Sequence, residues 1–243
     1  MFADSRHRSL LLAALAFLLV LLIWQVPALN GLLYPFRYFV TTIHEMSHGL
    51  AAEISGGEFR EYQVYASGAG VATTAHRAPW LVIPAGYVGT ALFGAALLYL
   101  TNRTAQTQAI AVILGVGLGA ITVAFARSGT AIVVGLLSTA VLIALGWKAP
   151  RLLVTFVLNV LAMLTGLNAV LDLWGLLNSL DAQAVTRLGN IPNDAYHMAQ
   201  AVGILPAAGW AIVWMLQALA LLGLSAYLTF WRPLRRRASD PAA

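Results

Sequence analysis

Long apolar stretches constrain this chain more than any other feature of its sequence. Six of them approach the ~20 residues that an α-helix needs to cross a lipid bilayer. They cover residues 10–29, 81–100, 109–126, 130–147, 152–171 and 206–230. Only 9% of the 243 residues are charged, whereas a soluble domain carries roughly 25%, so a soluble globular enzyme and a disordered chain are both excluded. We therefore expect an all-α polytopic membrane protein in which residues 1–243 form a single domain.

A seventh apolar stretch, residues 38–54, is interrupted by His44, Glu45 and His48. If this stretch crosses the membrane, there are seven transmembrane helices and the two termini lie on opposite sides. If it does not cross, there are six, and one side holds both termini together with nine of the 14 Lys and Arg residues. Cytoplasmic loops are enriched in Lys and Arg, so this distribution favours six spans and leaves seven as the alternative.

The order of the stretches places two distant segments on one membrane face. Four apolar stretches lie between residue 54 and Asp172, and four is an even number. The end of the stretch 38–54 and Asp172 are therefore expected on the same face in either topology. The segment that follows Asp172 should lie on that face too.

Three segments outside the apolar stretches have distinct expected roles. In residues 55–80, β-prone residues alternate on both sides of a Gly-rich turn, which predicts a short β-hairpin. This hairpin would either offer an edge strand to an unwound substrate or only cover the site at the membrane surface. Residues 178–205 form a polar loop, and residues 232–243 form a basic tail that we expect at anionic lipid headgroups. Because the basic residues flank apolar helices, the expected partner is the lipid bilayer and not a nucleic acid.

Residues 44–48 read His-Glu-Met-Ser-His, which is an H-E-x-x-H motif. On an α-helix, His44 and His48 lie on one face about 6 Å apart along the axis, so both imidazoles can reach one Zn²⁺ at about 2.0–2.1 Å. Glu45 would then take a proton from an activated water and return it to the leaving amine. Ionisable residues inside an apolar span are costly and point to function, and a bound metal accounts for all three. The chain has no cysteine, so a thiolate site is excluded.

A third zinc ligand must come from elsewhere, because a catalytic zinc site usually takes three protein ligands. Asp172 directly follows the apolar stretch 152–171 and lies between Leu171 and Leu173. Asp194 is the alternative, although an Asn-Asp pair before a helix-like segment also fits an ordinary helix N-cap. The apolar setting of Asp172 is the harder one to explain without a ligand, which favours Asp172. The two aspartates could also divide the work, with one on the metal and one beside it.

The motif and its surroundings resemble a known family. Residues 44–52, followed by Ser55-Gly56-Gly57, resemble the zinc helix of the site-2 protease family of intramembrane metallopeptidases, and more closely that of its compact bacterial branch. The glycine-patterned residues 85–94 resemble the small-residue helix that packs beside the zinc helix in those proteins.

The resemblance also extends to both candidate third ligands. Leu171-Asp172 resembles the Leu-Asp-Gly element that supplies the family's third zinc ligand, although Leu173 follows here in place of Gly. The segment Asn193-Asp194-Ala195, before the last span, resembles a feature of the compact branch.

The leading hypothesis is therefore an intramembrane zinc metalloprotease. The resemblance implies a multi-pass protein of the bacterial inner membrane that hydrolyses peptide bonds of membrane-anchored proteins with Zn²⁺ as its cofactor. Two alternatives come from other classes: a catalytically inactive homologue that acts as a membrane binding partner, and a small transporter. A transporter would show repeated, broken helices, and the sequence shows no such repeat.

Overall fold

The computed structural model describes residues 2–25, 30–178 and 193–233. Its elements, in chain order, are α1 (Phe2–Gln25), α2 (Asn30–Ile54), β1 (Glu58–Val64), β2 (Gly70–Ala75), α3 (Pro79–Val82), α4 (Ala85–Arg103), α5 (Thr107–Phe125), α6 (Gly129–Lys148), α7 (Arg151–Asn178), α9 (Asp194–Val202), α10 (Ala207–Ala226) and the π-helical η2 (Tyr227–Trp231). Half of the predicted polar loop 178–205, residues 179–192, and most of the basic tail 232–243 lie outside the described residues. The described half of that segment is not a simple loop as predicted, because it contains helix α9.

The expected all-α polytopic membrane protein is confirmed. Within the described ranges, four helical segments are long and apolar enough to cross a membrane: α5, α6, residues 151–177 of α7, and α10 continued by η2. A shorter apolar helix covers residues 10–22. The total of six or seven spans stays a prediction. The predicted hairpin is also present, because β1 and β2 pair antiparallel within residues 55–80.

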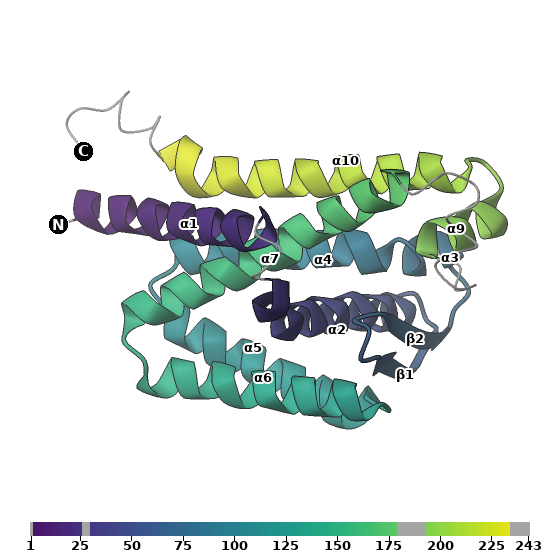
Figure 1. Cartoon of the computed structure of the whole chain (residues 1–243), viewed down its shortest axis with the longest axis horizontal. Coiled ribbons are helices and arrows are strands. Elements are labelled where there is room, and N and C mark those ends of the chain that lie inside the picture. The colour runs from purple at the N-terminus through teal and green to yellow at the C-terminus, as the bar shows by residue number, and fades with distance from the viewer. Residues whose placement is uncertain (1, 26–29, 179–192, 234–243) are drawn as a thin grey trace.

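The long helices lie roughly side by side, and α2 lies among them (Figure 1). α2 packs against α4, α6, α7 and both strands. The start of α1 and the end of η2 lie at one end of the molecule, whereas the hairpin, α3 and α9 lie at the opposite end (Figure 1). The ends of α2 and α7 both point toward the hairpin end (Figure 1), in agreement with the four long helices, α4 to α7, that follow the end of α2.

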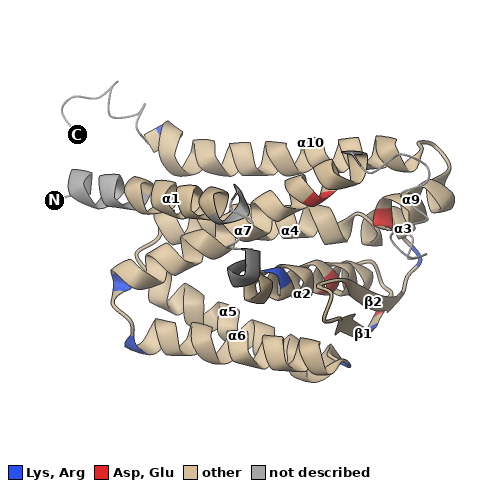
Figure 2. Cartoon of the chain, in the orientation of Figure 1, with Lys and Arg blue, Asp and Glu red and all other residues tan. Residues whose placement is uncertain are grey.

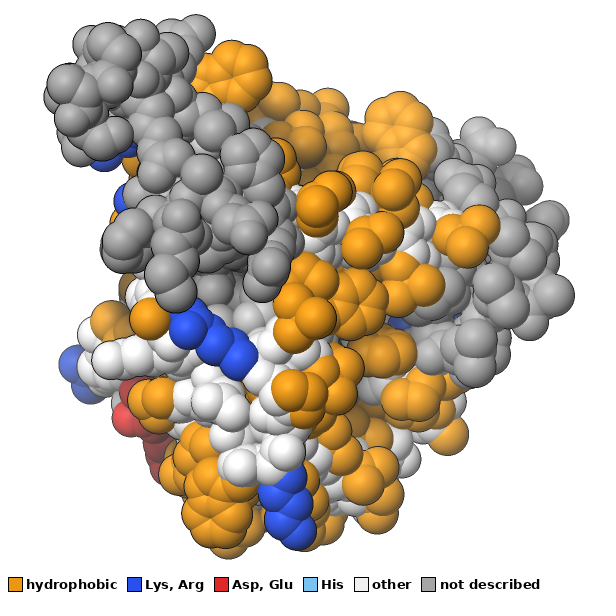
Figure 3. All heavy atoms as spheres, turned by 90° about the vertical axis from the view of Figure 1, so that its left-hand side faces the viewer, with side chains coloured by type: hydrophobic (Ala, Val, Ile, Leu, Met, Phe, Trp, Pro, Cys, Tyr) orange, Lys and Arg blue, Asp and Glu red, His pale blue; other side chains and the backbone are white. Residues whose placement is uncertain are grey.

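Charged residues are confined mainly to the ends of the helices (Figure 2). Lys148 ends α6 and Arg151 begins α7, at the end of the molecule away from the hairpin. Figure 3 shows that face, where Lys and Arg side chains lie among hydrophobic ones. Basic side chains at the ends of apolar helices are typical of membrane proteins, where they lie at the lipid headgroups.

The hairpin is fixed to the helices by aromatic packing. Phe59 of β1 is buried and stacks on Phe125 of α5, with ring centroids 4.3 Å apart. On its other side, Phe59 lies against Gly49 of α2, where a Cβ atom would come within 2.3 Å of the ring. Tyr62 is fully buried, and its hydroxyl pairs with Thr122 Oγ1 at 3.3 Å. This packing fixes the position of β1 along the axis of α2.

The two outer edges of the hairpin have different surroundings. On the β1 edge, the amide of Arg127 donates to the Tyr62 carbonyl at 3.0 Å, and Ser128 Oγ bonds to both the amide and the carbonyl of Val64 at 2.9 Å. The connection between α5 and α6 thus covers this edge. The β2 edge faces the other way, toward a pocket that Gly70, Ala72 and other residues of the strand line.

Candidate metal centre

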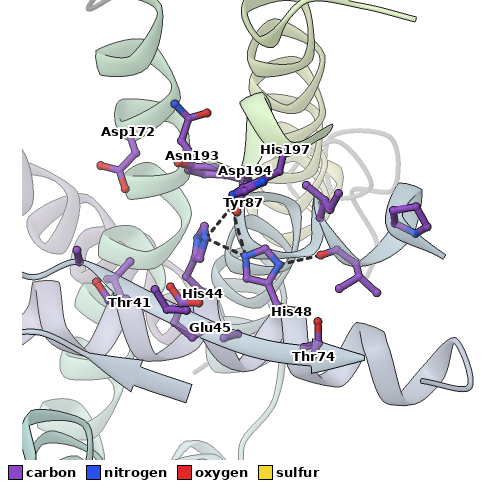
Figure 4. Close-up of a pocket in the computed structure, with 18 of the residues that line it drawn as sticks. Thr41, His44, Glu45, His48, Thr74, Tyr87, Asp172, Asn193, Asp194 and His197 are labelled. Atoms are coloured by element: carbon purple, nitrogen blue, oxygen red, sulfur yellow. Dashed lines mark hydrogen bonds and ion pairs between the residues drawn. The ribbon is translucent and has the colours of Figure 1, made fainter. Parts of the chain in front are cut away.

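A polar pocket of about 810 Å³ lies at the hairpin end of the bundle. Helices α2, α4, α7 and α9, the loop around α3 and the strand β2 all contribute to its lining (Figure 4). Every residue predicted for the site lines this pocket: His44, Glu45, His48, Asp172 and Asp194. Segments that are up to 150 residues apart in the sequence therefore meet here.

Helix α2 supplies the motif as the sequence predicted. His44 and His48 are one turn apart on α2, and their Nε2 atoms are 3.2 Å from each other. His48 Nδ1 lies 2.7 Å from the carbonyl oxygen of Val82 in α3. A carbonyl accepts only, so Nδ1 carries a proton, and Nε2 is the ring nitrogen left for a metal in the pocket.

Asp194 reaches the two histidines from the first turn of α9. Its Oδ2 atom lies 3.0 Å from His44 Nε2 and 3.3 Å from His48 Nε2. The N-cap role belongs to Asn193, whose side-chain oxygen accepts from the Tyr196 amide at 2.9 Å. Asp194 is therefore free of the capping role that the sequence offered for it, and its carboxylate turns toward α2 (Figure 4).

The three side chains form a compact group of ligand atoms. His44, His48 and Asp194 each offer one atom, and these atoms lie within 4.8 Å of one another. Among the described residues, this is the one group of three or more His, Asp or Glu side chains with that geometry. In a tetrahedral zinc site with bonds of about 2.0–2.1 Å, neighbouring ligand atoms lie about 3.3 Å apart. The observed separations of 3.0, 3.2 and 3.3 Å match that spacing.

The carboxyl group of Asp194 is ionised in this setting. Burial alone would raise its pKa, but the charge of His48 and the hydrogen bonds from His44 and His48 outweigh burial and hold the pKa well below its usual range. A carboxylate is the form that binds a metal. The donor set of two imidazoles and one carboxylate is one that Zn²⁺ accepts.

Glu45 lies beside the group of ligand atoms and not within it. Its side chain is buried, with 6% of its surface exposed, and it lines the pocket next to β2. A Cβ atom on Gly70 would come within 2.5 Å of Glu45 Oε1, so the strand approaches the carboxylate as closely as a glycine allows. The carboxylate is thereby held between the candidate metal ligands and β2.

Asp172 lines the same pocket but belongs to a different arrangement. Its carboxylate accepts a hydrogen bond from Asn168 Nδ2, one turn earlier on α7. It is not one of the three residues whose ligand atoms converge. The structure thus brings Asp194, and not the favoured Asp172, to the histidines. The physical reason is that α9 packs against α3 and α10, which brings its first turn to His44 and His48, and no sequence pattern indicates this packing.

Helix α4 closes the site on the side away from the hairpin. A Cβ atom on Gly86 would lie 2.3 Å from His44 Nε2 and 2.5 Å from His48 Nε2, so the backbone itself contacts the imidazoles. Gly89 packs in the same way against Ser47 of α2. Tyr87 meets His44 edge-on, with ring centroids 4.8 Å apart. The expected packing of a small-residue helix beside the helix that carries the H-E-x-x-H motif is therefore present.

The comparison with family models decides the family. The model described as Peptidase M50B-like matches residues 6–225, which is most of the chain. The chain belongs to the Peptidase M50B-like family. This is the site-2 protease type of membrane metallopeptidase, the one that the residues around His44 resemble. No curated protein and no solved structure matched the chain.

For this Peptidase M50B-like protein, the sequence predicted some of the pocket and missed other parts. The residues of the H-E-x-x-H motif and both aspartates were predicted from sequence. The Val82 carbonyl, Tyr87 and Thr41 were not, although all three line or flank the pocket. The position of Thr41 could have been predicted, because it precedes Glu45 by four residues and so lies on the same face of the helix. A backbone carbonyl such as that of Val82 gives no signal in a sequence.

Proposed function

We propose that this protein is an intramembrane zinc endopeptidase that cleaves membrane-anchored proteins. The observation that carries the proposal is the triangle of His44 Nε2, His48 Nε2 and Asp194 Oδ2, with separations of 3.0–3.3 Å. The imidazoles attract the Asp194 carboxylate through their Nε2 protons, and one cation bound in place of those protons would keep the same three atoms together. The membership of a metallopeptidase family supports the same conclusion.

The proposed zinc ligands are His44, His48 and Asp194, with Asp172 outside the ligand set. When bound, zinc supplies a Lewis acid that activates water and polarises a carbonyl group. Glu45 accepts the proton of the attacking water and donates it to the leaving amine. Its burial between α2 and β2 keeps the carboxylate in place for both steps. His48 is held in the correct tautomer by the Val82 carbonyl.

The β2 edge that faces the pocket is the proposed binding site for the substrate backbone, and on this edge the Ala72 backbone already bonds to Glu45. A peptide bond inside a helix is shielded, so the substrate must be extended before hydrolysis. An extended peptide can pair with an exposed strand edge, and β2 lines the pocket with Gly70, Val71, Ala72 and Thr74. The β1 edge is already bonded to Arg127 and Ser128. This difference between the two edges favours substrate pairing over a purely covering role for the hairpin.

The proposed setting is the bacterial inner membrane, with the lipid bilayer around the helices and a polypeptide substrate anchored in it. Nucleic acid has no place in this proposal, because the basic residues lie at helix ends among apolar side chains. Water reaches the site through the polar lining, which includes Asn168, Asn193 and Gln200.

Removal of the metal tests the proposal. We expect 1,10-phenanthroline to stop cleavage of a single-span peptide by the purified protein in detergent, and stoichiometric zinc to restore it. Magnesium at the same concentration is the control and should not restore it, because Mg²⁺ prefers oxygen ligands. The measurement is the appearance of product by mass spectrometry, together with the zinc content of each sample. Undiminished cleavage by protein freed of zinc would refute the proposal.

A further inference from the structure

Two side chains of α2 hold the turn of the hairpin, and neither is a proposed zinc ligand. Tyr38 Oη donates to the Ala66 carbonyl at 2.8 Å, and Thr41 Oγ1 donates to the Gly68 carbonyl at 2.7 Å. Tyr38, Thr41 and Glu45 are spaced by three and four residues, so they lie along one face of α2. The residues that hold the turn and the proposed general base therefore share one rigid element.

The turn does not need these two bonds in order to form. The Tyr65 amide donates to the Ala69 carbonyl at 2.8 Å, and the Gly68 amide donates to the Tyr65 carbonyl at 2.9 Å. Gly68 has φ +90°, a conformation that glycine adopts without strain. These contacts close the turn from within. Phe59, Arg127 and Ser128 fix the β1 side of the hairpin, and what the bonds from α2 add is a fixed position of the turn and of the start of β2.

Thr41 is also connected to Glu45 through the strand itself. A Cβ atom on Gly70, the first residue of β2, would lie 2.6 Å from Thr41 Cγ2 and 2.5 Å from Glu45 Oε1. The start of β2 is thus packed against both side chains. A strand advances about 3.4 Å per residue. A shift of the hairpin by that distance would move any paired peptide by one residue relative to the zinc ligands.

We propose that Tyr38 and Thr41 are positioning residues that set the register in which β2 presents an extended peptide to the metal site. They thereby select the bond that is cleaved. The inference rests on the proposed function, because it requires that β2 receives the substrate. Both residues act through the hairpin, by way of the Ala66 and Gly68 carbonyls.

The test uses the full chain in detergent and three variants. Thr41→Val removes the hydroxyl group with little change of volume, Thr41→Ser retains a hydroxyl group, and Tyr38→Phe removes one oxygen atom. The probe is a synthetic single-span peptide with an Asn-Gly pair that weakens its helix near one end. Products are assigned by mass spectrometry, kcat and KM are measured, and zinc content is determined for each protein.

We expect the wild type and Thr41→Ser to cut the probe at one main bond. Thr41→Val and Tyr38→Phe should each raise KM about five-fold, the effect of losing a hydrogen bond of about 1 kcal/mol. They should also release products cut at neighbouring bonds, while zinc content and kcat stay close to those of the wild type. A role in folding alone would not change the cleavage position.

Three results would overturn the inference. The first is a single unchanged bond with unchanged KM in both Thr41→Val and Tyr38→Phe. The second is loss of zinc from both Thr41→Val and Thr41→Ser. Thr41 would then support the fold and would not set the register of the substrate. The third is a zinc-loaded wild type that cleaves no probe, a result that rejects the proposed function as well and is recognised from the wild type alone.

Discussion

Glu45→Gln is expected to abolish peptide cleavage while zinc stays bound. Gln has the same shape as Glu but cannot accept the proton of the attacking water. General acid–base catalysis contributes about 10²–10⁴-fold to a rate, so kcat should fall at least about 100-fold. Glu45 is outside the group formed by His44, His48 and Asp194, and for that reason the metal content should not change. Product formation and zinc content are measured on the same preparation.

The control for this experiment is Glu53→Gln, on the same helix. The Glu53 carboxylate accepts a hydrogen bond from the Phe59 amide at 2.7 Å and does not line the pocket. A glutamine oxygen can accept the same bond, so the variant should cleave like the wild type. Equal cleavage by Glu45→Gln and the wild type would end the assignment of Glu45 as the general base.

Gly86→Ala is expected to prevent zinc binding without unfolding the protein. The new methyl group would lie 2.3 Å from His44 Nε2 and 2.5 Å from His48 Nε2. The imidazoles can rotate away from such a contact, but rotation takes their nitrogens out of the ligand position. The fold has no such conflict, since alanine is favoured in a helix over glycine. The zinc content should therefore fall to a small fraction of the wild-type value, and cleavage should fall with it.

Gly223→Ala provides the matched control. This glycine is also helical, in α10, but a Cβ atom there meets no atom within 4 Å. Both variants are compared by zinc content and by thermal unfolding in detergent. If Gly86→Ala retained full zinc, the close contact between α4 and the imidazoles would not exist in the folded protein.

The helices and the hairpin could be predicted from the sequence because their patterns are local. Apolar stretches gave the approximate positions of α4, α5, α6, α7 and α10, and alternation around a Gly-rich turn gave β1 and β2. The boundaries of α2 differ more. The apolar stretch starts at residue 38, whereas α2 starts at Asn30 and contains Pro35. A proline within a helix is disfavoured, so no sequence rule would have extended the helix across it.

The candidate site was predictable only as far as its residues lie on one helix. His44, Glu45 and His48 follow from spacing on α2. The choice between Asp172 and Asp194 depends on how α7 and α9 return to α2, which is a matter of tertiary packing. The apolar neighbours of Asp172 suggested a buried carboxylate that needs a metal, but Asn168 satisfies it instead. Asn193 caps α9, and the Asp194 side chain therefore contacts the histidines.

The central claim is that His44, His48 and Asp194 together bind one zinc ion. The most direct measurement is the zinc content of purified Asp194→Asn and Asp172→Asn beside the wild type, after dialysis against a weak chelator. Our account predicts stoichiometric zinc in the wild type and in Asp172→Asn, and almost none in Asp194→Asn. Zinc retained by Asp194→Asn and lost from Asp172→Asn would contradict it.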